Sequence, residues 1–410
     1  MTPIPQVDVG EFVDALTSAG VSLFTGVPDS LLKSFCAYVT DNCGENHVIA
    51  ANEGGAVGLA AGYYLATGNP ALVYMQNSGQ GNAVNPLASL ADPDVYSIPM
   101  VLLVGWRGEP GVKDEPQHVK QGKVTISLFE TLGVPTEVLP DDESAALELT
   151  RRMVDRAKTE SRPVALVVRK GLFAEYKLQN REDDIAELRR EVAIEGILRG
   201  LPKDAVVVST TGMISREVYE TRERLGQGHE RDFLTVGSMG HAIMIALGIA
   251  KAQPKRKVYC LDGDGASIMH LGNMAIAGQS GCENLTHIVF NNAAHDSVGG
   301  QPTVGGKIDF EKIAEELGYN VLQSPQDQYV DAHQLGVEEI TGGMEWLVSM
   351  LEQAESYRSD ALDGPPPRPN FILFRVAKGA RKDLGRPKEP PQTNKALYMK
   401  TLQGIDASKI

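Results

Sequence analysis

The sequence of 410 residues has few cysteines, no surplus of basic residues and no long apolar run, and each absence argues against a class of site or partner. The four cysteines (Cys36, Cys43, Cys260 and Cys282) lack the paired spacing of a zinc site or redox motif, so we expect reduced, packed thiols. The formal net charge of −14 argues against general nucleic-acid binding. No segment is long and apolar enough to span a membrane, and residues 1–5 have no signal-peptide character. We therefore expect a cytoplasmic protein with no nucleic-acid or membrane partner.

Apolar segments typical of buried strands alternate with helical patterns along the whole chain. This alternation predicts an α/β fold with doubly wound parallel sheets covered by helices on both faces, and the length allows about two domains. A helix is expected from residue 9 to residue 20, after a capping box formed by Asp8 and Glu11. The expected strands lie near residues 21–24, 48–51, 72–75, 101–104, 164–168, 206–208, 233–236, 258–261, 287–290, 320–322 and 371–376.

The most informative pattern is a Gly-Asp-Gly motif followed, after 25 residues, by Asn-Asn. A strand at 258–261, a helix at 268–280 and a strand at 287–290 would form a right-handed crossover, so both strands run in parallel. If the strands are neighbours, Asp264 and Asn292 emerge from them roughly 5 Å apart. One Mg²⁺ ion can then contact both side chains, because it takes oxygen ligands and usually keeps phosphate oxygens in its shell.

The turn after Gly-Asp-Gly adds a place for an anion. The free N–H groups of Ala266 and Ser267, at the amino end of the predicted helix, would face the same spot and favour a diphosphate. The alternative is two ordinary turns, which either motif alone would more often be. Their order and spacing together favour a metal-diphosphate clamp.

These residues resemble the signature of the thiamine diphosphate enzymes. The resemblance implies that Mg²⁺ is held by Asp264, by the side chain of Asn292 and by the backbone carbonyl of Ala294. Many relatives have glycine at that last position, but the ligand there is a main-chain oxygen. The other candidate contacts to thiamine diphosphate are Ser78, Gly79, Thr211, Gly212, Gly237, Gly263, Gly265, Ala266 and Ser267.

Two further side chains match positions that act on the cofactor in this family. Glu53 follows a predicted strand and matches the acid that protonates the aminopyrimidine ring, which requires a carboxyl group within hydrogen-bond reach. The alternative for Glu53 is a first-turn glutamate stabilised by the helix dipole. Met239 matches the apolar residue that supports the bent shape of the cofactor, and its alternative is core packing.

The chain also contains an internal repeat. Residues 55–82 and 240–267 both read as a small-residue helix, a turn, an apolar strand and a glycine-containing turn, although two βα units can also coincide by chance. With the resemblance, this repeat predicts a pyrimidine-binding domain at 1–176, a linker at 177–190 and a diphosphate-binding domain with a C-terminal extension at 191–410. The third, central domain of larger relatives is missing.

The compact layout and the segments 25–30, 114–118, 295–303 and 378–387 resemble the phosphonopyruvate decarboxylase family, and the sulfopyruvate decarboxylases are similar. The resemblance implies decarboxylation of 3-phosphonopyruvate to phosphonoacetaldehyde and CO₂ in phosphonate biosynthesis. It also implies a homodimer or homotetramer with its sites between subunits.

Several polar residues are candidates for contacts with the substrate. The candidates for proton transfer or substrate orientation are Asp29, His118 and His295, whose alternatives are a turn acid, a helix-leading polar residue and a surface histidine. The candidates for binding the phosphonate are Arg107, Lys113, Lys120 and Lys307, although charges on loops are usually only solvated.

Three other interpretations of the motifs remain to be compared. Asp262 and Asp264 could be the paired acids of an aspartyl-phosphate phosphatase, with Asp262 as the nucleophile. A calcium loop starting at Asp262 would need glutamate at its twelfth position, where the chain has Asn273. A binding protein that keeps the thiamine fold without turnover is a third alternative, and the presence of Glu53 argues against it.

Overall fold

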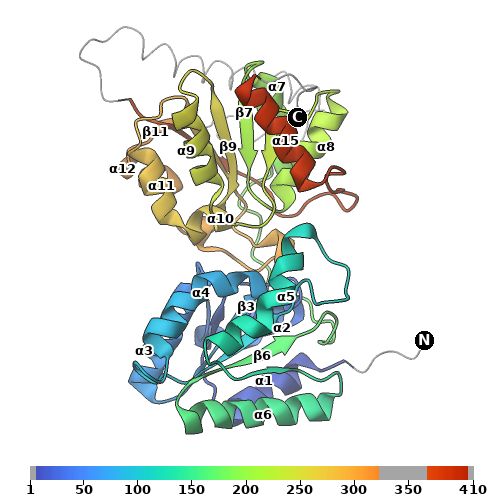
Figure 1. The fold of residues 1–410 in the computed structure, drawn as a ribbon, viewed down its shortest axis with the longest axis vertical. Helices are drawn as coiled ribbons and strands as arrows, with labels where there is room; N and C mark the ends of the chain where they lie inside the picture. The colour runs from blue at the N-terminus through green and yellow to red at the C-terminus, as the bar shows by residue number, and fades with distance from the viewer. Residues whose placement is uncertain (1–5, 323–366, 405–410) are drawn as a thin grey trace. The chain divides into compact units, whose positions relative to one another are not determined.

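The computed structural model describes residues 6–322 and 367–404, which divide into two compact units. Among the described residues, the first unit comprises 6–182 and 295–301, and the second comprises 183–294, 302–322 and 367–404. Each unit is built on one six-stranded parallel sheet (Figure 1). The two sheets with flanking helices confirm the predicted α/β fold. The domain boundaries and the linker at 177–190 stay predictions.

The first sheet has the strand order β2-β1-β3-β4-β6-β5. Its strands are β1 (Phe24–Gly26), β2 (His47–Ile49), β3 (Ala71–Gln76), β4 (Met100–Gly105), β5 (Thr136–Val138) and β6 (Pro163–Val168). The helices of this unit are α1 (Val9–Ser18), α2 (Lys33–Asn42), α3 (Glu53–Thr67), α4 (Gln80–Pro86), α5 (Pro116–Thr131) and α6 (Glu143–Glu160).

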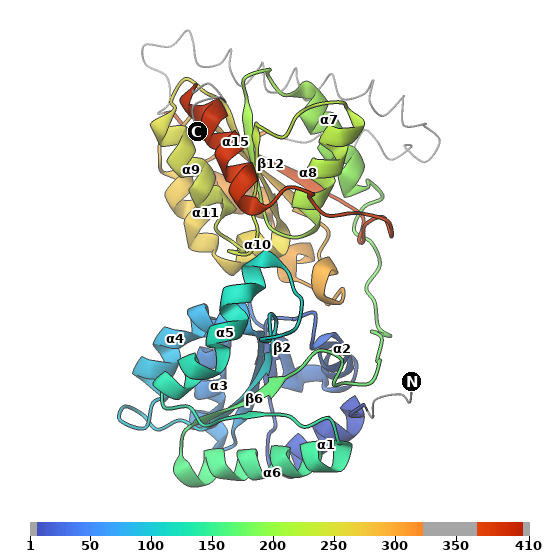
Figure 2. The ribbon, with the colours of Figure 1, turned by 45° about the vertical axis from the view of Figure 1, so that its right-hand side comes forward.

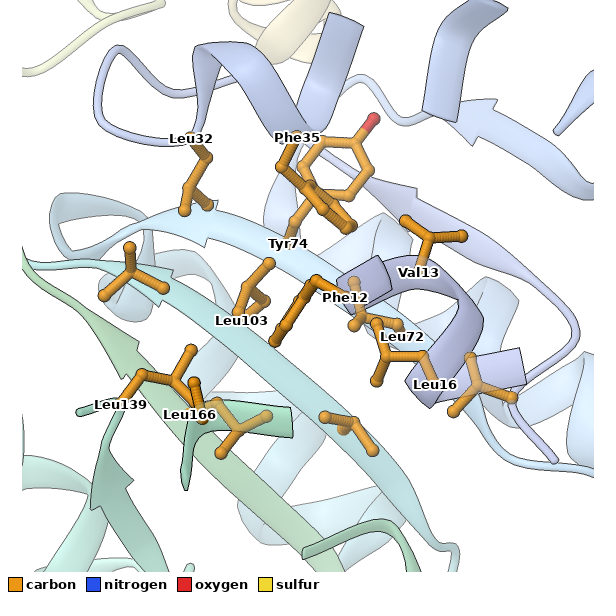
Figure 3. Close-up of a cluster of buried hydrophobic side chains, with 14 of the residues drawn as sticks. Phe12, Val13, Leu16, Leu32, Phe35, Leu72, Tyr74, Leu103, Leu139 and Leu166 are labelled. Carbon is orange, nitrogen blue, oxygen red and sulfur yellow. The ribbon is translucent and has the colours of Figure 1, made fainter. Parts of the chain in front are cut away.

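Both faces of the first sheet are buried. Leu72 and Tyr74 of β3 point into a cluster with Phe12 of α1 and Phe35 of α2 (Figure 3). Because side chains alternate along a strand, the intervening Val73 lies in a different cluster, with residues of α3, α4 and α5. Burial on both faces explains why the strands are continuous apolar runs.

The second sheet has the strand order β11-β12-β10-β9-β7-β8. Its strands are β7 (Val206–Ser209), β8 (Asp232–Leu234), β9 (Val258–Gly263), β10 (Leu285–Asn291), β11 (Asn320–Leu322) and β12 (Asn370–Arg375). The described helices are α7 (Arg190–Gly200), α8 (Met213–Arg224), α9 (Ala242–Ala252), α10 (Asp264–Met269), α11 (Leu271–Gly278), α12 (Phe310–Glu316) and α15 (Pro391–Gln403).

The two sheets share one topology. Read from the opposite edge, the second sheet has the order β8-β7-β9-β10-β12-β11, which matches the order β2-β1-β3-β4-β6-β5 of the first sheet strand by strand. The strands β3 and β9, which the internal repeat paired, therefore occupy equivalent positions. This equivalence confirms the repeat and shows that it covers a whole sheet in each unit.

The helix α15, drawn in red in Figure 2, contacts the outer strand β8 of the second sheet. Asn394 of α15 accepts a hydrogen bond from the N–H of Leu234 (3.2 Å) and donates one to the carbonyl of Asp232 (2.8 Å). These bonds satisfy backbone groups of an edge strand that would otherwise be open to pairing.

Some local predictions were wrong. The strand expected at 21–24 lies at Phe24–Gly26, and the short edge strand β5 was not predicted. The side chain of Asp8 caps α1 by accepting bonds from Gly10 and Glu11, but its own N–H donates to Glu143 of α6 rather than to Glu11. The capping box is therefore only half formed within the helix.

The region after β9 also differs from the prediction. The turn expected at the Gly-Asp-Gly motif is instead helical from Asp264. The helix expected at 268–280 is interrupted at His270, where φ is −134° and ψ is 55°. The interruption is set by contact with Gly240: a Cβ at Gly240 would lie 2.6 Å from the His270 ring, and Asn273 donates to the Gly240 carbonyl (2.9 Å). Tertiary packing thus divides one predicted helix into α10 and α11.

The cysteines and the apolar helices can be followed in the structure. All four cysteines are free, and Cys36 and Cys260 are buried. Within residues 6–322 and 367–404, no helix has the length and apolar character needed to cross a membrane.

Candidate cofactor site

The strands β9 and β10 are parallel neighbours, as the spacing of the two motifs required. Gly263 pairs with Phe290 in their register, so the chain leaves both strands at the same edge of the sheet. Asp264 and Asn292 follow directly, and each side chain is buried, with 3% exposed. A carboxylate and an amide are thereby held at neighbouring positions out of bulk water.

The turn after β10 is fixed by its own asparagines. Asn291 donates to the carbonyl of Gly305 (2.8 Å) and accepts from the N–H of Ala293 (3.0 Å). Ala293 takes the left-handed conformation at φ 55°, whereas Ala294 lies outside that region. Alanine at position 294, where many relatives have glycine, therefore costs no backbone strain.

The carbonyl of Ala294 is left outside the bonds that close the following loop. Ala294 and Pro302 face one another in an antiparallel bridge, whose hydrogen bonds run from the N–H of Thr303 to Ala293 and from the N–H of His295 to Gln301. Neither bond uses the Ala294 oxygen, and Pro302 has no N–H to offer it. This main-chain oxygen is available to a ligand.

The loop before α9 presents Met239 on a tightly curved backbone. Gly237, Ser238 and Gly240 all have positive φ values (66°, 47° and 82°), and Thr211, just after β7, accepts a bond from the N–H of Gly237 (3.1 Å). Met239 is half-buried within its unit. Its side chain is accordingly not enclosed in the core, which leaves part of its surface for contact with a ligand.

Glu53 lies at the first position of α3, after the N-cap residue Asn52, whose side chain accepts a bond from Gly55 (2.8 Å). Only 4% of Glu53 is exposed, and burial raises the pKa of its carboxyl group. Asn82 of α4 donates a hydrogen bond of 2.7 Å to Oε2 of Glu53, which offsets part of that rise. A Cβ at Gly79 would lie 2.1 Å from Oε1, so only glycine leaves room for the carboxyl group there.

Comparison with known proteins identifies the family. The family model described as "Thiamine pyrophosphate enzyme, N-terminal TPP binding domain" matches residues 10–128, and its C-terminal counterpart matches residues 210–339. Phosphonopyruvate decarboxylase of Streptomyces viridochromogenes is 33% identical over 406 residues, covering 94% of this chain and 92% of that protein. This chain belongs to the phosphonopyruvate decarboxylase family of thiamine pyrophosphate enzymes.

Two other relatives bear on the specificity of this thiamine pyrophosphate enzyme. Phosphonopyruvate decarboxylase of Streptomyces hygroscopicus is 32% identical over 404 residues, covering 94% of this chain and 92% of that protein. Sulfopyruvate decarboxylase of Methanosarcina acetivorans is 27% identical over 340 residues, covering 75% of this chain and 81% of that protein. The two kinds of decarboxylase are thus both relatives of this chain.

The residues of the second unit have the chemistry to hold a metal-bound diphosphate. Asp264, Asn292 and Ala294 offer a carboxylate, an amide oxygen and a carbonyl, a set that suits Mg²⁺. The hydroxyl of Thr303 donates to Asp264, and a Cβ at Gly305 would lie 2.6 Å from Oδ2 of Asp264. The buried hydroxyl of Ser267 has no hydrogen-bond partner within the described protein, so it is available to a phosphate oxygen.

Asp29 is held at the same edge of the first sheet as Glu53. Its Oδ1 accepts from Gln76 at the end of β3 (2.7 Å), and its Oδ2 accepts from the N–H of Leu31 (3.0 Å). Burial is complete and raises the pKa of Asp29. A Cβ at Gly105, the last residue of β4, would lie 2.0 Å from Oδ2, so the carboxyl group is packed against backbone.

The two candidate histidines are both disposed to be neutral. His118 lies in the first turn of α5 with 7% of its surface exposed, and burial lowers its pKa to about 4. Its Nδ1 has no partner within the described residues. Burial also lowers the pKa of His295, on the loop after β10. At neutral pH, each ring would therefore carry one N–H and one unprotonated nitrogen.

The candidate phosphonate-binding side chains differ in whether other residues of the protein already bind them. Arg107 donates to Asp114 from Nε (2.8 Å) and to Ser30 from Nη1 (2.9 Å), and the hydrogen bond from Arg107 holds the pKa of Asp114 well below its usual value. Lys113 and Lys120 are exposed. A cavity of about 450 Å³ is lined by Asn291, Gly305, Lys307, Arg375 and neighbouring residues.

The geometry also argues against the phosphatase alternative. Asp262 is fully buried, with Oδ2 lying 3.4 Å from Nε2 of His287, which is itself fully buried. A nucleophile has to reach its substrate, and this carboxyl group faces the core instead. The family match, together with this burial, removes the phosphatase interpretation.

Sequence reasoning missed three polar partners of the candidate residues. Asn82 bonds Glu53, Gln76 bonds Asp29, and Thr303 bonds Asp264. In the sequence, these partners were marked only by lying in the repeat segment 55–82 or in the loop segment 295–303. Their partners depend on the approach of segments that are distant in the chain.

Proposed function

We propose that this chain catalyses the thiamine diphosphate- and Mg²⁺-dependent decarboxylation of 3-phosphonopyruvate to phosphonoacetaldehyde and CO₂, a step of phosphonate biosynthesis. The observation that carries the proposal is the similarity, over 94% of the chain, to phosphonopyruvate decarboxylase. The burial of Glu53, Asp264 and Asn292 at the ends of strands supports it. Bound thiamine diphosphate would supply the electron sink for the electron pair released when CO₂ leaves.

The protein's share of this reaction is binding, orientation and proton handling. Asp264, Asn292 and the carbonyl of Ala294 would hold Mg²⁺, and Glu53 would exchange a proton with the aminopyrimidine ring. A carboxyl group whose pKa is raised by burial suits that exchange, because it can hold the proton nearer neutral pH than an exposed glutamate can.

Delivery of a proton to the product carbon needs a second acid. Asp29, His118 and His295 are the candidates for proton transfer or substrate orientation, and the neutral rings of the two histidines suit orientation better. Asp29 has a raised pKa because it is buried, so it can carry a proton at a higher pH than an exposed aspartate. Contact with the phosphonate stays a hypothesis for four side chains, Arg107, Lys113, Lys120 and Lys307.

We further propose a homodimer or homotetramer in which each site takes Glu53 from one subunit and Asp264 from another. The cytoplasmic location expected from the sequence stays a prediction.

A CO₂-release assay tests the proposed function. Purified protein with thiamine diphosphate and Mg²⁺ is given phosphonopyruvate, sulfopyruvate or pyruvate, and kcat/KM is compared. We expect phosphonopyruvate to be the preferred substrate. A preference for sulfopyruvate would favour the second candidate function, which the Methanosarcina acetivorans relative supports, and a preference for pyruvate would overturn both.

A further inference from the structure

We propose that Asn82 is a positioning residue that decides which oxygen of Glu53 exchanges the proton with the pyrimidine ring. The inference rests on the proposed function, because it concerns the same cofactor. Its basis is the hydrogen bond of 2.7 Å from Nδ2 of Asn82 to Oε2 of Glu53, which joins the first residue of α3 to α4.

The chemistry of the amide nitrogen assigns the two oxygens. Nδ2 of Asn82 is a donor only, so Oε2 of Glu53 has to act as an acceptor in this contact whether or not the carboxyl group is ionised. In a neutral carboxyl group the carbonyl oxygen is a better acceptor than the hydroxyl oxygen, so the bond from Asn82 favours the acidic hydrogen of Glu53 on Oε1. In the proposed exchange, Oε1 of Glu53 would give up its hydrogen to a ring nitrogen of the bound cofactor, and the carboxylate left behind would keep the bond from Asn82.

Two glycines build this arrangement. A Cβ at Gly79 would lie 2.1 Å from Oε1, so a side chain there would fill the space beside the reactive oxygen. A Cβ at Gly54 would lie 2.8 Å from the carbonyl of Asn82, so the close approach of α3 and α4 also depends on glycine. The contact between Asn82 and Glu53 is thus enforced by the backbone rather than by two free side chains meeting.

Because Glu53 is buried, its carboxyl group needs the hydrogen bond from Asn82. A carboxyl group with 4% exposure has little water to satisfy Oε2, and without a donor the group could rotate to exchange its two oxygens. The influences on the pKa of Glu53 are burial, which raises it, and the bonds from Asn82 and from its own N–H, which lower it. No charged side chain is among them, so the effect of removing Asn82 can be read directly.

The first measurement is made on the full chain before cofactor is added. Infrared difference spectra against Glu53→Gln identify the carboxyl band of Glu53, and its titration midpoint is compared between wild type and Asn82→Ala. We expect a higher midpoint in Asn82→Ala, because a bond that favours the ionised form is lost. An unchanged midpoint would show that Asn82 does not bond Glu53 and would overturn the proposal.

The second measurement uses the protein loaded with thiamine diphosphate and Mg²⁺. Near-ultraviolet circular dichroism reports the tautomer of the bound pyrimidine, and deuterium exchange reports activation of the cofactor. Asn82→Leu, which keeps about the size of the side chain but has neither a donor nor a charge, should shift the tautomer ratio and slow exchange on the order of 10²-fold. Wild-type values in this variant would refute the positioning role even if the titration had moved.

Controls separate this proposal from misfolding and from failure of the proposed function. Asn42→Ala removes an asparagine of α2 that bonds Tyr38 and Tyr176 in the same unit, and it should leave both measurements unchanged. If Asn82→Ala does not fold, the uncharged Asn82→Leu variant is used for both measurements. Absence of decarboxylation by the wild type would reject the proposed function, while the titration and the dichroism would still decide the role of Asn82.

Discussion

Glu53 combines burial, which opposes its charge, with a hydrogen bond that supports it, and this balance suits a group that exchanges a proton. Replacement by Gln removes the proton while keeping the shape and the ability to accept from Asn82. We expect Glu53→Gln to retain the affinity for thiamine diphosphate and Mg²⁺ measured by calorimetry and to lose on the order of 10²-fold or more in kcat. Near-normal turnover would exclude Glu53 from the mechanism.

We propose the opposite role for Asp264, whose charge would serve the binding of Mg²⁺ rather than proton transfer. In Asp264→Ala the carboxylate that would hold Mg²⁺ is lost, so the purified variant should not retain thiamine diphosphate. Cofactor content is measured after gel filtration, with Asp94→Ala, which removes an exposed carboxylate, as the control. Stoichiometric cofactor in Asp264→Ala would contradict the proposed clamp.

At the scale of elements, the break between α10 and α11 depends on the glycine that faces it. Gly240 has φ 82°, and a Cβ there would lie 2.6 Å from the His270 ring. Gly240→Ala should therefore lower the midpoint of thermal unfolding, with a cost of about 1–3 kcal/mol from backbone strain. The loop that carries Met239 would also shift, so the affinity for thiamine diphosphate should fall.

A matched control lies on the adjacent helix. Gly248 is inside α9 and does not have a positive φ, and a Cβ added there would meet no neighbouring atom within 4 Å. Gly248→Ala should raise the unfolding midpoint slightly, since alanine stabilises a helix interior by roughly 0.5–1 kcal/mol relative to glycine. A loss of stability in Gly248→Ala as large as that in Gly240→Ala would show that the local geometry at His270 is not the cause.

Some helices and strands could be predicted from the sequence and others could not. Central strands such as β4 and β9 were predicted because burial on both faces gives apolar runs, and their register then brought Asp264 and Asn292 to one edge. The strand β5 was missed because Thr-Glu-Val at a sheet edge has no such run. The division of the helix after Asp264 and the bond between Asn82 and Glu53 depend on contacts between distant segments, for which the local sequence carries no pattern.

At the scale of the whole molecule, the decisive question is whether one subunit completes the site of another. Glu53 belongs to the first unit and Asp264 to the second, and the proposed dimer takes them from different chains. Light scattering should therefore give at least a dimer, and an active monomer would rule this arrangement out.

Mixing two inactive variants gives a sharper test of the shared site. Glu53→Gln and Asp264→Ala subunits are unfolded together and reassembled in equal amounts with thiamine diphosphate and Mg²⁺. If each site draws on two chains, a mixed dimer has one site with both defects and one with neither. Random association makes half of the dimers mixed, so about one quarter of the wild-type activity should return. If each site lies within one chain, every site keeps one defect, and the mixture stays as inactive as its separate components.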